Sequence, residues 1–228
     1  MGSTYIDNAK EVAIVAWQDM DLTDFTGPLE VLSHARTSSR ERLLRTTIAA
    51  ASDLVGTSQG VKVGRDVDIP TLLSDLPKFD ILIIPGGGGF SADSVVEAPG
   101  VREVLEAFAA LPARPDSPRV IMSICAGAFF LAEAGMLVGK IATTHYAFLQ
   151  ELDKVGRRQG DIKIVRQHYV DAGVTANGTQ VITSGGIVSG FDSTLYLLEQ
   201  HFGFEVAERS RAIMDAAWRK EMTPYGFA

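Results

Sequence analysis

The feature that most constrains the fold is a regular alternation of short Val- and Ile-rich runs with segments of helical periodicity. Runs that are apolar throughout indicate strands buried on both faces, and the intervening helices supply the crossovers that parallel strands need. The sequence therefore predicts an α/β fold of the flavodoxin-like, doubly wound type: a mostly parallel sheet with helices on both faces. Strands are predicted at residues 12–17, 46–51, 79–85, 119–124, 141–144, 162–170 and 180–184, with an exposed ribbon at 61–69.

Helices are predicted where apolar side chains recur at three- and four-residue spacing. The first follows the first strand, with Thr26 as a plausible cap and Pro28 in its first turn. The proline-rich stretch 112–118 is interpreted as a surface connection, because the strand–helix pattern resumes directly after it. We therefore expect one domain over residues 1–228. Later helices are predicted around 101–108 and at 126–134, 147–155, 189–202 and 206–218.

Composition and charge exclude several functional classes. The chain has 21 Lys and Arg against 28 Asp and Glu, a net charge of -7, so no basic field would attract nucleic acid. Residues 1–11 lack a signal peptide pattern, which predicts a cytoplasmic protein. The apolar stretch 120–139 contains Glu133 and glycines, so no membrane span is expected. The histidines lack metal-ligand spacing, and we expect neither a metal nor a cofactor.

Cys125 is the one cysteine, and it falls among small residues at a predicted strand-to-helix turn. A sharp turn of this kind, a nucleophile elbow, holds a reactive side chain at the edge of the sheet. A helix N-terminus also favours the thiolate, so we expect a lowered pKa for Cys125. The alternative is a buried cysteine that packs as a small apolar residue. The position at a strand end favours the nucleophile.

Three further features follow the carboxyl ends of predicted strands, where open α/β sheets bind ligands. The run that begins at Gly86 lacks the Lys-Ser/Thr of a phosphate-binding loop, so it is either a flexible loop or a source of backbone donors. We predict that the N–H groups of Gly87, Gly88 and Ala126 form an oxyanion hole. Asp24, taken alone, is better explained as a helix cap. Opposite Cys125, however, it would be a shielded carboxyl with a raised pKa, able to exchange protons.

His145 ends another predicted strand, and we predict that it lines the same pocket and binds substrate. A partly buried histidine with a structural role is the alternative, and it is slightly favoured. Because Ala126 follows the thiol, no histidine stands directly beside Cys125 to form a protease-like Cys-His pair.

Four motifs together resemble the ThiJ/PfpI superfamily of the class I glutamine-amidotransferase-like fold, over about residues 12–211. They are DFTGPLEVL, DILIIPGGGG, SICAGAFFLAEAGMLVGKIATTHY and ITSGGIVSGFD. Within the superfamily the chain looks most like isonitrile (isocyanide) hydratase, and it also resembles the sensor-like N-terminal domain of AraC-type regulators. Asp24 stands where many members carry a glutamate near the nucleophile. Ala126 stands where the hydratase tends to have threonine.

The resemblance implies a cysteine-dependent hydro-lyase that adds water to a small-molecule isocyanide and releases an N-substituted formamide. Cys125 would form a thioimidate with the substrate while Asp24 supplies and removes protons. The resemblance also implies a homodimer. Two alternatives are a cofactor-free glyoxalase acting on another electrophile, a 2-oxoaldehyde, and a non-enzymatic redox or ligand sensor. Asp24 is shorter than the glutamate of such glyoxalases, which disfavours the former.

Overall fold

The computed structural model describes residues 4–93 and 96–220. Its strands are β1 (Tyr5–Ala16), β2 (Arg42–Ala50), β3 (Leu54–Gly56), β4 (Lys62–Gly64), β5 (Val67–Asp68), β6 (Ile81–Ile84), β7 (Val120–Ser123), β8 (Ile141–Ala142), β9 (Lys163–Ile164), β10 (Tyr169–Val174) and β11 (Gln180–Ser184). Its helices are α1 (Leu22–Ser33), α2 (Ile69–Asp75), α3 (Val101–Ala110), α4 (Ala128–Glu133), α5 (Leu149–Gln159), α6 (Ser189–Phe202) and α7 (Phe204–Ile213).

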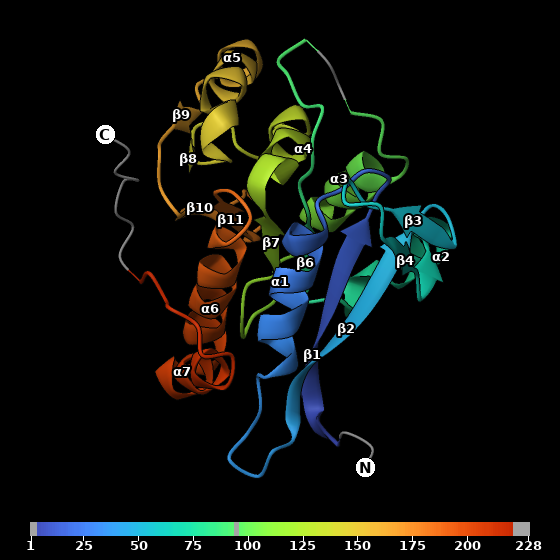
Figure 1. Cartoon of the computed structure of the whole chain (residues 1–228), viewed down its shortest axis with the longest axis vertical. Coiled ribbons are helices and arrows are strands. Elements are labelled where there is room, and N and C mark those ends of the chain that lie inside the picture. Colours follow the sequence, from blue (N-terminus) through green and yellow to red (C-terminus); the bar gives the residue numbers. More distant parts are fainter. Residues whose placement is uncertain (1–3, 94–95, 221–228) are drawn as a thin grey trace.

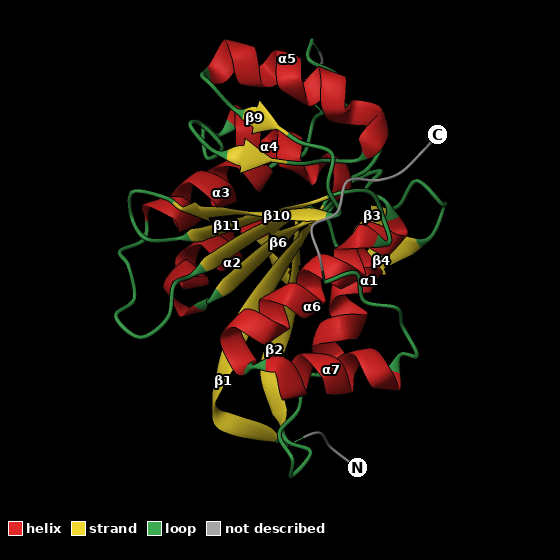
Figure 2. Cartoon of the chain, turned by 90° about the vertical axis from the view of Figure 1, so that its left-hand side faces the viewer, coloured by secondary structure: helices red, strands yellow, loops and turns green. Residues whose placement is uncertain are grey.

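The central sheet has seven strands in the order β10-β11-β7-β6-β1-β2-β5. All its neighbouring pairs are parallel except β10 with β11. Helices α1 and α6 lie side by side in front of the sheet (Figure 1), and α3 and α4 lie across the sheet from them (Figure 2). The fold is therefore flavodoxin-like α/β, as the sequence predicts.

The apolar runs form the core of this sheet. Every residue of β6 and β7 is buried, and so are the last five residues of β1. These strands lie at the centre of the sheet, where both faces are covered, which explains why their sequences show no polar alternation. Their carboxyl ends meet at one edge, and that edge carries the three motifs that follow residues 17, 85 and 124.

Several predicted boundaries are wrong. The single strand predicted at 162–170 is two strands, because β9 pairs with β8 while β10 pairs with β11. The first helix begins before Thr26, whose hydroxyl donates to the Leu22 carbonyl inside α1 (2.8 Å), and Pro28 lies beyond the first turn. Helix α2 was not predicted, and α7 ends at Ile213 rather than at 218. None of the helices in the described part of the chain has the length and hydropathy that crossing a bilayer requires.

An ion pair between the buried Asp192 and the partly exposed Arg219 secures the start of α6. The carboxyl of Asp192 is almost fully buried and accepts hydrogen bonds from the backbone N–H (2.9 Å) and Nε (2.8 Å) of Arg219. We expect Arg219→Ala to cost about 1–3 kcal/mol of unfolding free energy, because the buried Asp192 carboxylate keeps its bond from the backbone N–H of residue 219 but loses the partly exposed guanidinium.

Urea unfolding measures this cost, and Arg102→Ala is the matched control. Arg102 pairs with Glu106 at the surface (2.7 Å), and such a pair contributes only about 0.5 kcal/mol. Equal losses in the two variants would contradict the account of the Asp192–Arg219 pair.

Candidate active site

Cys125 lies directly after β7, on a backbone turn that side chains rarely adopt. The preceding Ile124 is still extended, whereas Cys125 has a φ of 55°, in the left-handed region. The 3₁₀ turn Cys125–Gly127 then leads into α4. Hydrogen bonds hold the turn: the Cys125 N–H donates to the Gly185 carbonyl (3.1 Å), and the Gly127 N–H donates to the Ile124 carbonyl (2.8 Å). This is the strand–turn–helix geometry of a nucleophile elbow.

Two glycines allow the backbone around the thiol to pack closely. A Cβ at Gly127 would lie 2.5 Å from the Ile84 carbonyl oxygen, and a Cβ at Gly86 would lie 2.5 Å from the Ala126 nitrogen. The same Gly86 Cβ would come within 2.9 Å of Oδ2 of Asp24. The first glycine of the run is therefore required by close contact at the end of β6, and it brings the peptide of residue 86 against Asp24.

Asp24 lies in the first turn of α1 and is completely buried. Its carboxyl contacts the Cys125 thiol and the N–H groups of Gly86 and Ile187. Neither carboxyl oxygen has a hydrogen-bond partner of good geometry among the described residues. A buried polar group without such a partner is costly and needs an explanation, and a catalytic role is one. The interpretation of Asp24 as the helix cap is wrong, because the cap is Asp21.

The electrostatics of the pair follow from this burial. Burial, with a further contribution from the Asp21 carboxylate, raises the pKa of Asp24 to about 7. Burial and then the neighbouring Asp24 raise the pKa of the Cys125 thiol above its ordinary value. The expectation of a lowered thiol pKa is therefore wrong, because desolvation outweighs the N-terminus of a six-residue helix. At neutral pH, Asp24 titrates while Cys125 retains its proton.

The backbone of Ile187 completes the site, and sequence reasoning missed it. Its N–H faces both Asp24 and Cys125, and each of these contacts lowers the pKa of the group concerned. Ile187 has a φ of 43°, which is strained for a β-branched residue and is typical of functional sites. It belongs to the quoted motif ITSGGIVSGFD, but a backbone donor leaves no signal in side-chain type.

Of the other predicted site residues, the structure places only some against Cys125 or Asp24. The N–H of Ala126 contacts the Cys125 thiol. Gly87, by contrast, packs beneath Trp17 and the peptide of Asp19, and the surroundings of Gly88 are open. Of the glycine run, it is thus Gly86, not Gly87 or Gly88, that contacts Asp24.

His145 lies close to the loop that carries Ile187. A Cβ at Gly186 would come within 2.1 Å of the His145 ring, so the ring rests on this glycine. Its Nδ1 accepts the Ala147 N–H (3.2 Å), and partial burial lowers its pKa. His145 therefore has the internal partner expected of a structural histidine and also a position beside the site.

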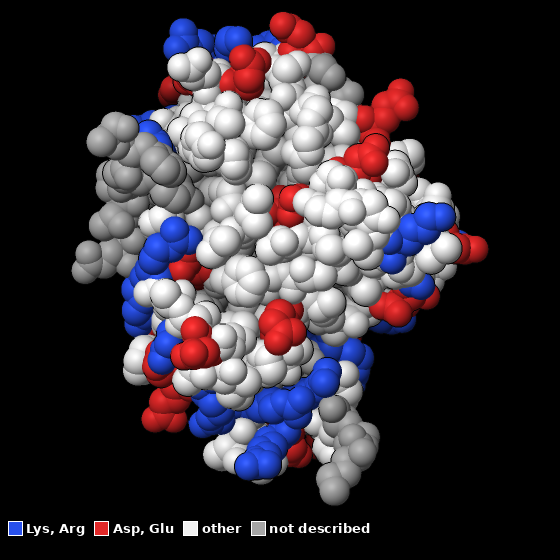
Figure 3. All heavy atoms as spheres, viewed as in Figure 1, with Lys and Arg blue, Asp and Glu red and all other residues white. Residues whose placement is uncertain are grey.

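The face that carries α1 and α6 has few charged side chains at its centre, and these include acidic ones (Figure 3). Exposed apolar side chains next to the site include Val188 (61% exposed) and Tyr146 (53%). In the part of the chain that the structure describes, no group of three or more His, Cys, Asp or Glu could hold a metal ion.

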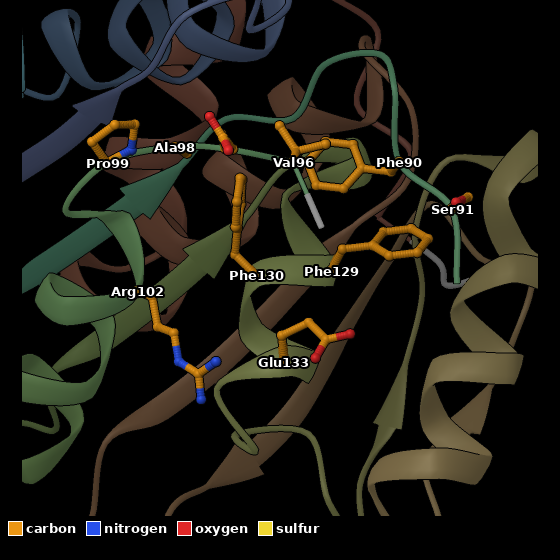
Figure 4. A pocket seen from close by; sticks show the side chains of 10 residues that line it. Phe90, Ser91, Val96, Ala98, Pro99, Arg102, Phe129, Phe130 and Glu133 are labelled. Carbon is orange, nitrogen blue, oxygen red and sulfur yellow. The ribbon is translucent and has the colours of Figure 1, made fainter. Parts of the chain in front are cut away.

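A separate apolar pocket of about 330 Å³ lies between the loop after β6 and helices α3 and α4. Figure 4 shows the rings of Phe90, Phe129 and Phe130 around it, with Arg102 and Glu133 near one end. Neither Cys125 nor Asp24 lines this pocket. It is therefore distinct from the thiol site.

Comparison with known proteins places these features in a family. The model of the DJ-1/PfpI family matches residues 10–200. Isonitrile hydratase of Pseudomonas putida is 24% identical over 200 residues, which cover 88% of this chain and 75% of that protein. A ThiJ/PfpI family protein from Pseudomonas syringae has a TM-score of 0.69 at 20% identity, over 95% of this chain and 78% of that one. Oxidized DJ-1 of Toxoplasma gondii has a TM-score of 0.67 at 21% identity, over 92% and 100%. With most of its length matched by the family model, the chain belongs to the DJ-1/PfpI family.

Proposed function

We propose that this chain is a cofactor-free, isonitrile hydratase-like enzyme that converts an isocyanide, R–N≡C, into an N-substituted formamide, R–NH–CHO. The observation that carries this proposal is the completely buried Asp24 carboxyl, without a good hydrogen-bond partner, against a thiol on a strained turn. A nucleophile and a proton-exchanging group in contact are what an addition to an electrophilic carbon needs.

In the first half of the reaction, the sulfur of Cys125 forms a bond to the terminal carbon of the isocyanide. The Asp24 carboxylate takes the thiol proton and passes it to the same carbon. The product is a thioimidate, R–N=CH–S–Cys125, and Asp24 is a carboxylate again. The N–H groups of Ala126 and Ile187 stabilise the negative charge on sulfur during the attack.

In the second half, water adds to the thioimidate carbon. Asp24 takes a proton from the water and delivers it to the substrate nitrogen. The resulting tetrahedral carbon carries a hydroxyl, whose proton moves to Asp24 as the C–S bond breaks. Formamide leaves, and the proton returns from Asp24 to the Cys125 thiolate. One water is consumed, and the pair regains its starting state.

The shape and charge of the site support an isocyanide as substrate. Only 5% of Cys125 is exposed, so little of the residue is accessible to a reacting atom. The carbon of an isocyanide is terminal and the group is linear, so it requires little width. The group is also uncharged, so the Asp21 and Asp24 carboxylates do not repel it as they would an anionic substrate.

The direct test is a formamide assay with purified protein and a panel of alkyl and aryl isocyanides. We expect turnover with at least one member of the panel. If the folded protein releases no formamide from any of them, the proposed function is wrong.

We also propose, from the resemblance, a homodimer. Light scattering would refute it by finding only the single-chain mass.

The pH dependence of the reaction follows from the Asp24 pKa of about 7. Below pH 7 the pair holds two protons, so no base is available to take the thiol proton. Above it, Asp24 is ionised while Cys125 remains a thiol. We therefore expect kcat to rise about tenfold per pH unit up to pH 7 and then level off. A rate that is independent of pH between 5 and 8 would contradict this assignment.

A further inference from the structure

Asp21 is a carboxylate fixed at the start of α1, immediately beside the site. Its Oδ1 accepts the backbone N–H of Thr23 (2.8 Å) and of Asp24 (3.2 Å). Its Oδ2 accepts the side-chain amide of Gln59 (2.6 Å). The Asp21 N–H donates to the Gly86 carbonyl (2.8 Å), so the residue is also tied to the glycine that contacts Asp24. These bonds leave the carboxylate little freedom to turn away.

Capping alone explains only part of this arrangement. Asparagine and serine cap a helix about as well as aspartate, and neither carries a charge. A second carboxylate beside a completely buried one is unfavourable, since like charges repel. Gln59 holds Asp21 in that position by a second contact as well, because its Oε1 accepts the Leu22 N–H (2.9 Å).

The charged, titratable and hydrogen-bonding groups that act on Asp24 come from four segments of the chain. Asp21 acts from the start of α1 and Cys125 from the turn after β7, while the loops of Gly86 and Ile187 contribute backbone N–H groups. The Asp21 carboxylate also acts on His145, which lies next to the loop of Ile187. Of these groups, Asp21 is the one that adds negative charge without a place in the proposed reaction.

We propose that Asp21 is a positioning residue for the reaction: its fixed carboxylate makes Asp24 a stronger base, able to take the Cys125 proton when substrate binds. A base works best when its strength is matched to the pH at which the enzyme operates. Repulsion from Asp21 adds to the effect of burial and raises the pKa of Asp24 toward neutrality. The chemical consequence of this inference rests on the proposed function, whereas the coupling of Asp21 to the Asp24–Cys125 pair does not.

The test compares Asp21→Asn with Asp19→Asn. Asp19 is exposed, lies on the turn that leads into α1, bonds to Gln18 (2.9 Å) and is not among the groups that act on Asp24. Two quantities are followed against pH: the rate at which iodoacetamide alkylates Cys125, and kcat for formamide release. Both rates should rise with pH at the acidic end of the profile, which is called the lower limb here. We expect Asp21→Asn to move this limb by about one pH unit to lower pH in both profiles. Its kcat at pH 8 should fall about threefold with an unchanged KM. Asp19→Asn should change neither.

A third variant separates charge from capping. Asp21→Ala should shift the limb as Asp21→Asn does, and should also lower the unfolding free energy in urea because the cap is lost. The inference is overturned if Asp21→Asn leaves the limb in place or if Asp19→Asn shifts it equally. If no isocyanide is hydrated but the alkylation limb still shifts, the proposed function fails and the coupling of Asp21 to the pair stands.

Discussion

Cys125→Ser is expected to lower kcat for formamide release at least about 10³-fold. The serine hydroxyl is a weaker acid than the thiol, so the Asp24 carboxylate removes its proton less readily. Serine is also a weaker nucleophile. The substitution replaces one atom in a buried turn, and we expect the variant to remain folded.

A formamide assay at pH 8 measures this effect, with circular dichroism as the check on folding. Ala126→Ser is a useful comparison, because it places a hydroxyl at the next position and keeps the thiol. Turnover by folded Cys125→Ser within a factor of ten of the wild type would mean that the thiol is not the nucleophile.

Asp24→Asn is expected to lower activity and raise stability. Loss of the proton-transferring group should reduce kcat by about 10²–10⁴-fold. Because the pKa of Asp24 is about 7 in the folded protein, against 3.8 for an ordinary aspartate, the folded state binds more protons than the unfolded state between these pH values. Ionising the buried carboxyl therefore lowers the stability of the wild type as the pH rises from about 4 to about 7.

Urea unfolding at pH 5 and pH 8 measures this linkage. The stability advantage of Asp24→Asn over the wild type should grow by about 3 kcal/mol between the two values. Asp192→Asn is the matched control, since Asp192 is also a buried aspartate in the first turn of a helix but is paired with Arg219. That variant should be destabilised. An Asp24→Asn advantage that does not depend on pH would argue against a raised pKa.

The buried strands and the class of the fold could be predicted because apolar runs indicate burial directly. β11 and α6 coincide with the predicted ranges 180–184 and 189–202, since both have clear periodicity and end at glycine or at a short polar segment. The prediction of a single strand at 162–170 is wrong because the pairing of β9 and of β10 depends on partners distant in sequence. The hydrophobic periodicity of a segment indicates which of its residues are buried. It does not indicate which strands are its neighbours in a sheet.

The proximity of the candidate site's two side chains could be predicted, because it depends on side-chain identity and strand direction. Cys125 after a buried strand and Asp24 after another indicated two groups at one edge, because parallel strands bring their carboxyl ends together. The sequence offered Asp24 and Thr26 as caps of the first helix, whereas the cap is Asp21; aspartate and threonine both suit that position, so residue type alone does not locate it. The Ile187 N–H beside the pair, and the contact of Asp24 with Gly86 rather than with Gly87 or Gly88, depend on backbone conformation. The sequence alone does not specify that conformation.

The most direct test of the central claim is the intact mass of the protein, quenched in acid during turnover of an aryl isocyanide. We expect the wild-type protein to gain the mass of one isocyanide molecule, localised by peptide mapping to Cys125, and Cys125→Ser to gain none. Asp24→Asn should show less adduct under the same conditions. Formamide release by the wild type with no adduct on Cys125 in rapid-quench samples, or equal turnover by Cys125→Ser, would contradict the proposed covalent mechanism.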